Sequence, residues 1–225
     1  FEFQLFAFEQ WGIPPLPYFQ EPPESPYSDQ VDDEYKEKYP LVLTTGARIW
    51  GFFHSEHRMF PRMREIQPEP QVRIHPETAA KYGVKEGDWG WIENHRGRCR
   101  QKVVLDSSYD PRVIAADHGW WFPEMEGEEP TLFGVFDSNI NNLTSQMQYG
   151  SSGYGAPYCC LMCNIYKCTD ENSDVLPTYQ VTRLGGWEYE MAQPNTAKVQ
   201  NADVNGDAQN NALYAGREGE KGMSR

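Results

Sequence analysis

Residues 71–116 read QVRIHPETAAKYGVKEGDWGWIENHRGRCRQKVVLDSSYDPRVIAA, and this stretch decides the fold. Pro76 suits the first position of a helix and Gly83 suits a left-handed cap, so a two-turn helix is predicted between them. Short apolar or alternating runs, separated by turn residues, predict strands at 71–74, 89–94, 98–105 and 112–116. With a further buried strand expected at 41–45, this spacing favours a closed or nearly closed β-barrel.

The composition of the whole chain agrees with a loop-rich, β-rich protein. The 225 residues include 19 Gly and 17 Pro, and 39% are hydrophobic, which suits one large domain with extensions. The net charge of -13 argues against a general nucleic-acid surface. No apolar run approaches the roughly 18 residues that span a bilayer, so we expect no direct membrane insertion.

Three regions are expected along the chain. Residues 1–40 are predicted to form a proline-rich, extended arm, 41–168 the barrel with its loops, and 169–225 a polar tail. The chain begins at Phe1 without a signal-peptide pattern, so the start of the protein is expected upstream and the localisation stays open.

Two short constellations near the first strand suit an anionic, polar ligand. In the first, Gly46 after Thr45 would expose backbone amides, and Arg48 would add a bidentate cation. In the second, His54, Ser55 and Arg58 would share one face if 54–58 is a turn of helix. A metal site at His54 and His57 is conceivable but lacks a third ligand. The alternative to a ligand site is a capped helix with surface histidines.

A second aromatic and amide-rich region, 117–145, is predicted to line a site. Trp120 and Trp121 follow a His-Gly pair at a strand end, where large rings could stack on a planar heterocycle. Asn139, Asn141 and Asn142 could read a base-like ring. Core packing of the tryptophans and local backbone capping by the asparagines are the alternatives.

The five cysteines permit a metal site but do not require one. Four of them lie in CCLMCNIYKC at 159–168, and the odd total argues against a complete set of disulfides. Cys160 and Cys163 form a CxxC that could begin a zinc or iron–sulfur site, although a second distant pair is missing. The alternative is half-buried thiols in a reducing or anaerobic setting.

Five segments, taken in order, resemble a known family: LVLTTGAR at 41–48, FHSEHR at 53–58, the run 64–98, ADHGWWFP at 116–123 and SNINNLT at 138–144. They are similar to the C-terminal molybdopterin dinucleotide-binding domain of the dimethyl sulfoxide reductase superfamily. The resemblance implies a mainly β, double-psi β-barrel with short helices and long irregular terminal extensions. It also implies that the barrel caps the pterins of a molybdenum or tungsten bis(pterin guanine dinucleotide).

Carried over by motif, the resemblance implies cofactor contacts but no catalytic or metal-ligating residue in this chain. The metal ligand and any iron–sulfur cysteines are expected upstream, so this fragment alone should not turn over substrate. A basic contact expected before Cys163 is replaced by Leu161 and Met162, with Lys167 a nearby candidate. The implied contacts are Thr45, Gly46, Arg48, His54, Ser55, Arg58, His118, Gly119, Trp120 and Asn141.

The implied activity is oxidoreductase chemistry of the anaerobic type. Within the family, the motifs IHPETA and ADHGWWFP are most similar to those of thiosulfate, polysulfide or catechol-type reductases and related hydratases. Partners would be the remaining domains of the catalytic subunit and, as a candidate, an iron–sulfur electron-transfer subunit. Two other hypotheses stay open: a stand-alone β-barrel binding or assembly module, and a zinc-stabilised module built on CCLMC.

Overall fold

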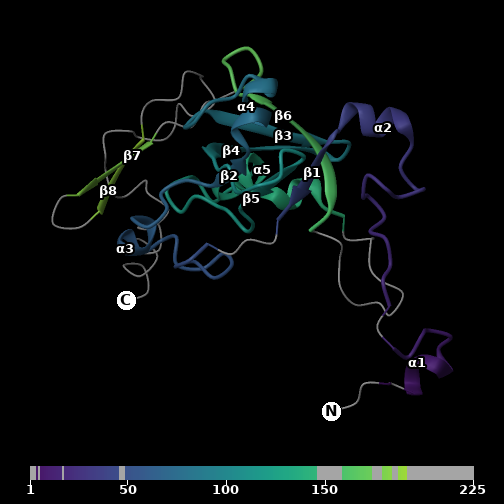
Figure 1. Ribbon diagram of the computed structural model, residues 1–225. Helices are drawn as coiled ribbons and strands as arrows, with labels where there is room; N and C mark the ends of the chain where they lie inside the picture. The colour runs from purple at the N-terminus through teal and green to yellow at the C-terminus, as the bar shows by residue number, and fades with distance from the viewer. Residues whose placement is uncertain are drawn as a thin grey trace, which may run out of the picture.

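Six strands close into one barrel in the computed structural model (Figure 1). The structure describes residues 4, 6–16, 18–45, 49–145 and 159–173, together with the backbone of a separate two-stranded sheet. The barrel order is β1-β5-β2-β4-β3-β6, and the separate sheet pairs β7 (Tyr179–Arg183) with β8 (Trp187–Met191). The barrel strands are β1 (Leu41–Thr44), β2 (Gln71–Ile74), β3 (Trp89–Asn94), β4 (Gly97–Leu105), β5 (Val113–Ala116) and β6 (Leu161–Lys167). The predicted mainly β, double-psi barrel class is confirmed.

Strand direction sets where the loops emerge. β1 pairs with β5 in parallel, with Val42 opposite Val113, and β2 pairs with β4 in parallel. The other four barrel pairs are antiparallel. Because neighbouring parallel strands end at the same edge, the loops that follow β1 and β5 start side by side.

The barrel interior is filled largely by aliphatic side chains, which alternate inward most clearly along β1 and β2. In β1, Leu41 and Leu43 are buried, whereas Val42 between them is partly exposed. Complete burial of one such side chain stabilises the fold by about 1.5 to 3 kcal/mol. The residues with no exposed surface include Leu43, Val72, Ile74, Ile92, Val103 and Ile114.

The helix predicted from Pro76 and Gly83 is present as α4 (Pro76–Tyr82). His75 caps its start by accepting a hydrogen bond from the Glu77 amide, at 3.2 Å. Gly83 ends it with a φ of 68°, in the left-handed region that glycine adopts readily. The predicted strands 71–74 and 89–94 match β2 and β3, whereas β6 was not predicted.

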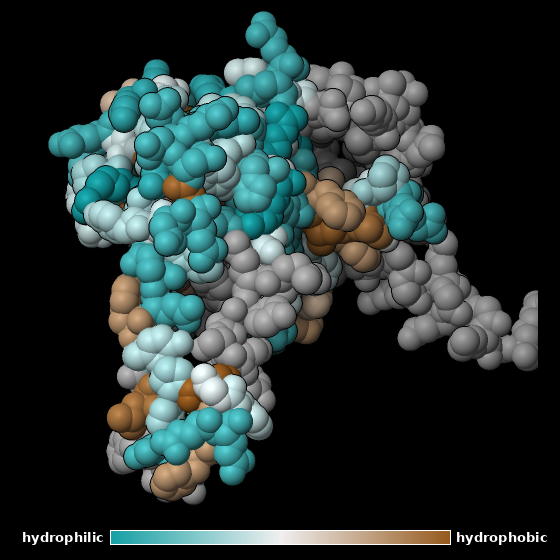
Figure 2. Space-filling model, turned by 90° about the vertical axis from the view of Figure 1, so that its right-hand side faces the viewer, coloured by the Kyte–Doolittle hydropathy of each residue, from teal (hydrophilic) through white to brown (hydrophobic). Residues whose placement is uncertain are grey.

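The N-terminal arm is only partly extended. It contains α1 (Phe6–Gln10) and α2 (Asp33–Lys38), and α2 begins where Asp32 accepts a hydrogen bond from the Tyr35 amide at 2.8 Å. α1 projects away from the barrel in Figure 1, and Figure 2 shows hydrophobic surface on this projecting part. Its exposed hydrophobic residues are Phe6, Trp11, Leu16, Tyr18 and Phe19.

The second half of the arm lies against the barrel. Glu24 forms an ion pair with Arg96 at the β3–β4 turn, and the Tyr35 hydroxyl lies 2.8 Å from Nδ1 of His95. Val31, Tyr39 and Met162 form a small buried cluster between arm and barrel. The region limits 1–40, 41–168 and 169–225 stay a prediction.

Short helical segments complete the described chain. They are α3 (Pro61–Arg64), η1 (Leu132–Gly134), α5 (Val135–Ser138) and η2 (Ile140–Leu143). No helix in the described part of the chain is long and apolar enough to cross a membrane.

Candidate functional site

Two loops that start at the same barrel edge meet through their predicted site residues. Nδ1 of His54, after β1, lies 3.0 Å from Nε2 of His118, after β5. The Trp121 indole Nε1 donates a hydrogen bond to the Ser55 carbonyl at 2.7 Å. The structure therefore brings together residues that stand more than sixty positions apart in the sequence.

Gly119 makes this close approach possible. Its φ is +63°, and a Cβ built there would lie 3.2 Å from the His54 carbonyl oxygen and 3.4 Å from Cβ of Ser55. A Cβ at position 119 would require the His54 carbonyl to shift by a few tenths of an ångström. The positive φ and the close approach both favour glycine at this position.

Arg58 lies beneath the two loops and is fully buried. Its Nη2 donates to the carbonyl oxygens of His54, at 3.1 Å, and His118, at 3.4 Å. The guanidinium carbon lies 4.5 Å from the Trp120 ring centroid and 5.0 Å from that of Phe52. Burial, followed by the nearby Arg64 charge, lowers the Arg58 pKa to about 10, so the group stays protonated at neutral pH. Arg58 thus bridges the loops from within, and its predicted cofactor contact stays a prediction.

Trp120 belongs to the core beside the site. It has no exposed surface and packs in a cluster with Ile49, Phe52 and Phe122. The aromatic wall predicted at this position is therefore an internal support, as in the core-packing alternative. Thr45, another predicted contact, is also buried, with 6% of its surface exposed.

The turn of helix on which a shared face for 54–58 depended is not formed. The segment is a series of turns in which Phe53 and His57 adopt φ values of 57° and 68°. Left-handed residues interrupt a right-handed helix, so the donors of 54–58 do not share one helical face. His57 instead places Nδ1 3.2 Å from the Gly51 carbonyl oxygen. Gly46 and Arg48 lie outside the described residues.

A buried ion pair that the sequence did not reveal fastens the loop after β5. Arg64 donates two hydrogen bonds to the Glu124 carboxylate, at 2.8 and 3.1 Å, and one to the Pro68 carbonyl at 2.6 Å. Both side chains of the pair are almost fully buried. The Arg64 guanidinium also lies 5.3 Å from the Trp120 ring centroid. The partners are sixty residues apart, and no local pattern marks them.

Asp117 anchors the start of the same loop. Its buried carboxylate accepts hydrogen bonds from the Gln71 amide at 2.7 Å and from Nη1 of Arg73 at 3.0 Å. Burial raises the Asp117 pKa, while the Arg73 charge opposes that shift. The carboxylate is therefore tied to the end of the barrel and is not presented to a ligand.

Gln101 joins this loop to the asparagine-rich segment. Its Nε2 donates to the carbonyl oxygens of Asp117, at 2.8 Å, and Ser138, at 3.2 Å. Asn139 caps the segment by accepting a hydrogen bond from the Asn141 amide, at 3.0 Å, and Asn141 itself is exposed. The capping interpretation of Asn139 is therefore correct, while the predicted contact by Asn141 stays a prediction.

The cysteines of the described chain are all free thiols. Cys99 and Cys163 are fully buried in the barrel and Cys159 is exposed. Among the residues that the structure describes, no group of three or more His, Cys, Asp or Glu side chains could hold a metal ion. Lys167, the candidate basic contact, pairs with Asp88 at 2.8 Å.

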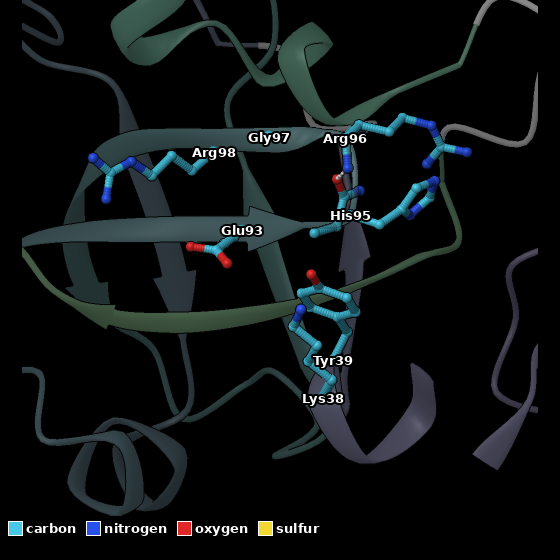
Figure 3. Close-up of a pocket in the computed structure, with 8 residues that line it drawn as sticks. Lys38, Tyr39, Glu93, His95, Arg96, Gly97 and Arg98 are labelled. Atoms are coloured by element: carbon cyan, nitrogen blue, oxygen red, sulfur yellow. Dashed lines mark hydrogen bonds between the residues drawn. The ribbon is translucent and has the colours of Figure 1, made fainter. Parts of the chain in front are cut away.

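A separate pocket of about 380 Å³ opens beside the β3–β4 turn (Figure 3). It is lined by Lys38, Tyr39 and residues 93–98, none of them a predicted site residue. Figure 3 shows the side chains of Arg96 and Arg98 pointing in opposite directions, so the cationic groups do not converge on one ligand position. The two-loop edge is the better candidate site.

The chain is similar to a known protein family and to several known proteins. Residues 41–158 match the family model described as "Molydopterin dinucleotide binding domain". A dopamine dehydroxylase of Eggerthella lenta is 39% identical over 159 residues, covering 70% of this chain and 15% of that protein. Acetylene hydratase of Syntrophotalea acetylenica is 36% identical over 127 residues, covering 56% of this chain and 17% of that protein.

A solved structure supports the fold assignment. Acetylene hydratase from Pelobacter acetylenicus superimposes with a TM-score of 0.64 at 32% identity, covering 72% of this chain and 22% of that chain. The chain therefore spans less than a quarter of the length of these relatives. The matched family model covers more than half of the chain, and the chain belongs to the molybdopterin dinucleotide-binding domain family of the dimethyl sulfoxide reductase superfamily.

Proposed function

We propose that this chain is the C-terminal cofactor-binding part of a molybdenum or tungsten bis(pterin guanine dinucleotide) oxidoreductase catalytic subunit. It caps the pterins, while the metal ligand and the reacting residues come from parts of the subunit outside this chain. The observation that carries the proposal is the meeting of the loops after β1 and β5, through the imidazoles of His54 and His118. The wider partners we propose are the remaining domains of the subunit and an iron–sulfur electron-transfer subunit.

The residues at this edge fit a polar, anionic dinucleotide. His54 and Ser55 are exposed and supply an imidazole and a hydroxyl, and Gly119 leaves backbone open to close approach. Beneath them lies a rigid layer built on Arg58 and Trp120. A few polar groups over a packed apolar base are typical of cofactor sites.

The cofactor and the residues of this chain have different roles in the proposed site. When bound, the metal–pterin group supplies the redox or Lewis-acid chemistry. His54, Ser55 and Asn141 bind and orient the dinucleotide, with Gly46 and Arg48 adding amides and a cation. The relatives include a dehydroxylase and a hydratase by name, so we assign no single substrate.

Cofactor content of the full-length subunit tests the proposal. Arg48→Ala combined with Asn141→Ala, and separately His54→Ala, should each weaken retention of the dinucleotide about tenfold or more, corresponding to ~1.4 kcal/mol. Elemental analysis measures molybdenum and tungsten, and fluorescence of the oxidised pterin measures the dinucleotide.

Arg98→Ala is the matched control, because it removes an exposed arginine at the Figure 3 pocket. It should leave the cofactor content unchanged. Full metal and pterin occupancy in all the site variants would contradict the proposal, whereas a missing upstream coding region would favour a stand-alone binding or assembly module.

A further inference from the structure

The imidazoles of His54 and His118 are joined ring to ring. At 3.0 Å between Nδ1 of one and Nε2 of the other, one nitrogen must donate and the other accept. The pair keeps this hydrogen bond when neutral, and also when it takes up one extra proton. A second extra proton would set two N–H groups against each other and break the bond. The contact is therefore compatible with at most one added proton.

The outer edge of this pair faces solvent. His54 is exposed, and within the described chain its second ring nitrogen, Nε2, has no hydrogen-bond partner. When the pair holds one extra proton, Nε2 of His54 carries an N–H whichever ring holds the positive charge, so the pair offers a cationic donor on an exposed residue. A cationic N–H donor suits a phosphate oxygen.

Arg58 sets the geometry of the pair from below. A single nitrogen, Nη2, contacts the backbone carbonyls of both histidines. The guanidinium also lies within 5.0 Å of the ring centroids of Phe52 and Trp120. No carboxylate of the described residues lies within ion-pair distance of Arg58, and its buried Nε and Nη1 have no hydrogen-bond partner there. Its neighbour Arg64, by contrast, is neutralised by Glu124.

We propose that Arg58 is a positioning residue that keeps His54 and His118 in one proton-sharing pair, whose singly protonated form offers Nε2–H of His54 to a phosphate of the bound dinucleotide. The phosphate ligand rests on the proposed function. The pairing of His54 with His118, and its support by Arg58, rest only on the hydrogen bonds described above.

Charged groups lie on each element next to the pair. On the β1 loop, the Glu56 carboxylate accepts a hydrogen bond from the His54 amide at 2.9 Å. Beneath the pair lies the Arg58 guanidinium, whose Nη2 donates to the backbone carbonyls of both histidines. On the β5 loop, Asp117 is engaged by Arg73 and adds little free negative charge.

The titration of each histidine in the full-length subunit tests the support by Arg58. Mass spectrometry of hydrogen exchange at the imidazole C2 position follows each residue from about pH 5 to 8. In the wild type, His54 and His118 should titrate as a coupled pair, in two steps more than about 1 pH unit apart. In Arg58→Lys the point charge cannot bridge both carbonyls, so each histidine should titrate in a single independent step.

Arg64→Lys is the matched control, because it replaces a second buried guanidinium that also contacts Trp120. It should retain the coupled steps. If Arg58→Lys does not fold, Arg58→Met keeps apolar packing against Phe52 and Trp120 but removes the donor nitrogen, and it should also uncouple the histidines. Independent titration in the wild type, or coupled titration in whichever of these two variants folds, overturns the positioning role.

Cofactor release tests the ligand separately. The rate of pterin dinucleotide release from the holo-subunit should rise about tenfold or more as the pair loses its extra proton with increasing pH. His54→Ala should remove this pH dependence. A pH-independent release from the wild type overturns the phosphate contact. If the holo-subunit carries no pterin, the proposed function fails, while the histidine titration still decides the role of Arg58.

Discussion

Gly119 shows how one residue controls the meeting of two loops. Its positive φ and its contact with the His54 carbonyl are separate demands, and only glycine satisfies both. The sequence placed His118 and His54 in candidate motifs, but the contact between them depends on strand direction. The sequence motifs of Arg58 and Trp120 do not reveal that both side chains are buried.

Gly119→Ala should destabilise the protein more than Gly87→Ala does. Both glycines have positive φ, which costs a substituted alanine about 1 to 2 kcal/mol. Only at position 119 would the new Cβ meet backbone, adding about 1 to 3 kcal/mol for overpacking. Thermal unfolding of the two variants measures the difference. Equal melting temperatures would show that the loops relax without cost.

Glu124→Gln should be strongly destabilising, because it leaves the buried Arg64 charge without its counterion. Breaking such a pair costs about 3 to 5 kcal/mol. The double variant Arg64→Met with Glu124→Met should regain much of this loss, because no buried charge remains. Chemical denaturation of the wild type, the single variant and the double variant measures these differences in the free energy of unfolding. A double variant less stable than the single one would argue that the pair itself is net stabilising.

Among the elements, α4 and β6 show what local pattern can and cannot predict. α4 was predictable because Pro76, Glu77 and Gly83 mark its ends within eight residues. β6 was missed because its sequence suggested a cysteine motif. Its strand identity comes from pairing with β1 and β3, which lie far away in the sequence. Tertiary pairing of this kind leaves little local signal.

Thiol alkylation should divide the cysteines around β6 into two classes. Cys159 is exposed and should react first at about pH 8, near the thiol range. Burial raises the pKa of Cys163 well above its ordinary range and that of Cys168 to about 12. Since the thiolate is the reactive form, both should react slowly, and Cys168 should accelerate as the pH rises. Peptide mapping of the alkylated full-length subunit measures each rate. Rapid labelling of Cys163 would contradict the closed barrel.

At the scale of the whole molecule, residues 24–39 of the N-terminal arm pack against the barrel. The region was expected to run extended over a surface, and the acidic stretch at 32–37 gave no helix prediction. Its attachment depends on Glu24, Tyr35 and Tyr39, whose partners lie on β6 and at the β3–β4 turn. Such distant partners cannot be deduced from a single sequence.

Residues 24–39 should therefore contribute to barrel stability, whereas residues 6–16 should not. Glu24→Ala removes the counterion of Arg96, a half-buried side chain, and should lower the melting temperature. Glu9→Ala is the matched control on the projecting α1, and it should leave the melting temperature unchanged. Differential scanning calorimetry of the full-length subunit measures both. Equal effects would mean that the Glu24 contact is dispensable.

The position of β6 also has a consequence during synthesis. β1 and β3 are made early, but both have β6 as a neighbour, and β6 follows β5 only after a long interval of chain. At about 5 to 20 residues per second, two strand edges stay open for several seconds on the ribosome. Unpaired edges are templates for aggregation, so a chaperone that shields β1 and β3 until β6 emerges should raise the yield of this protein in cells.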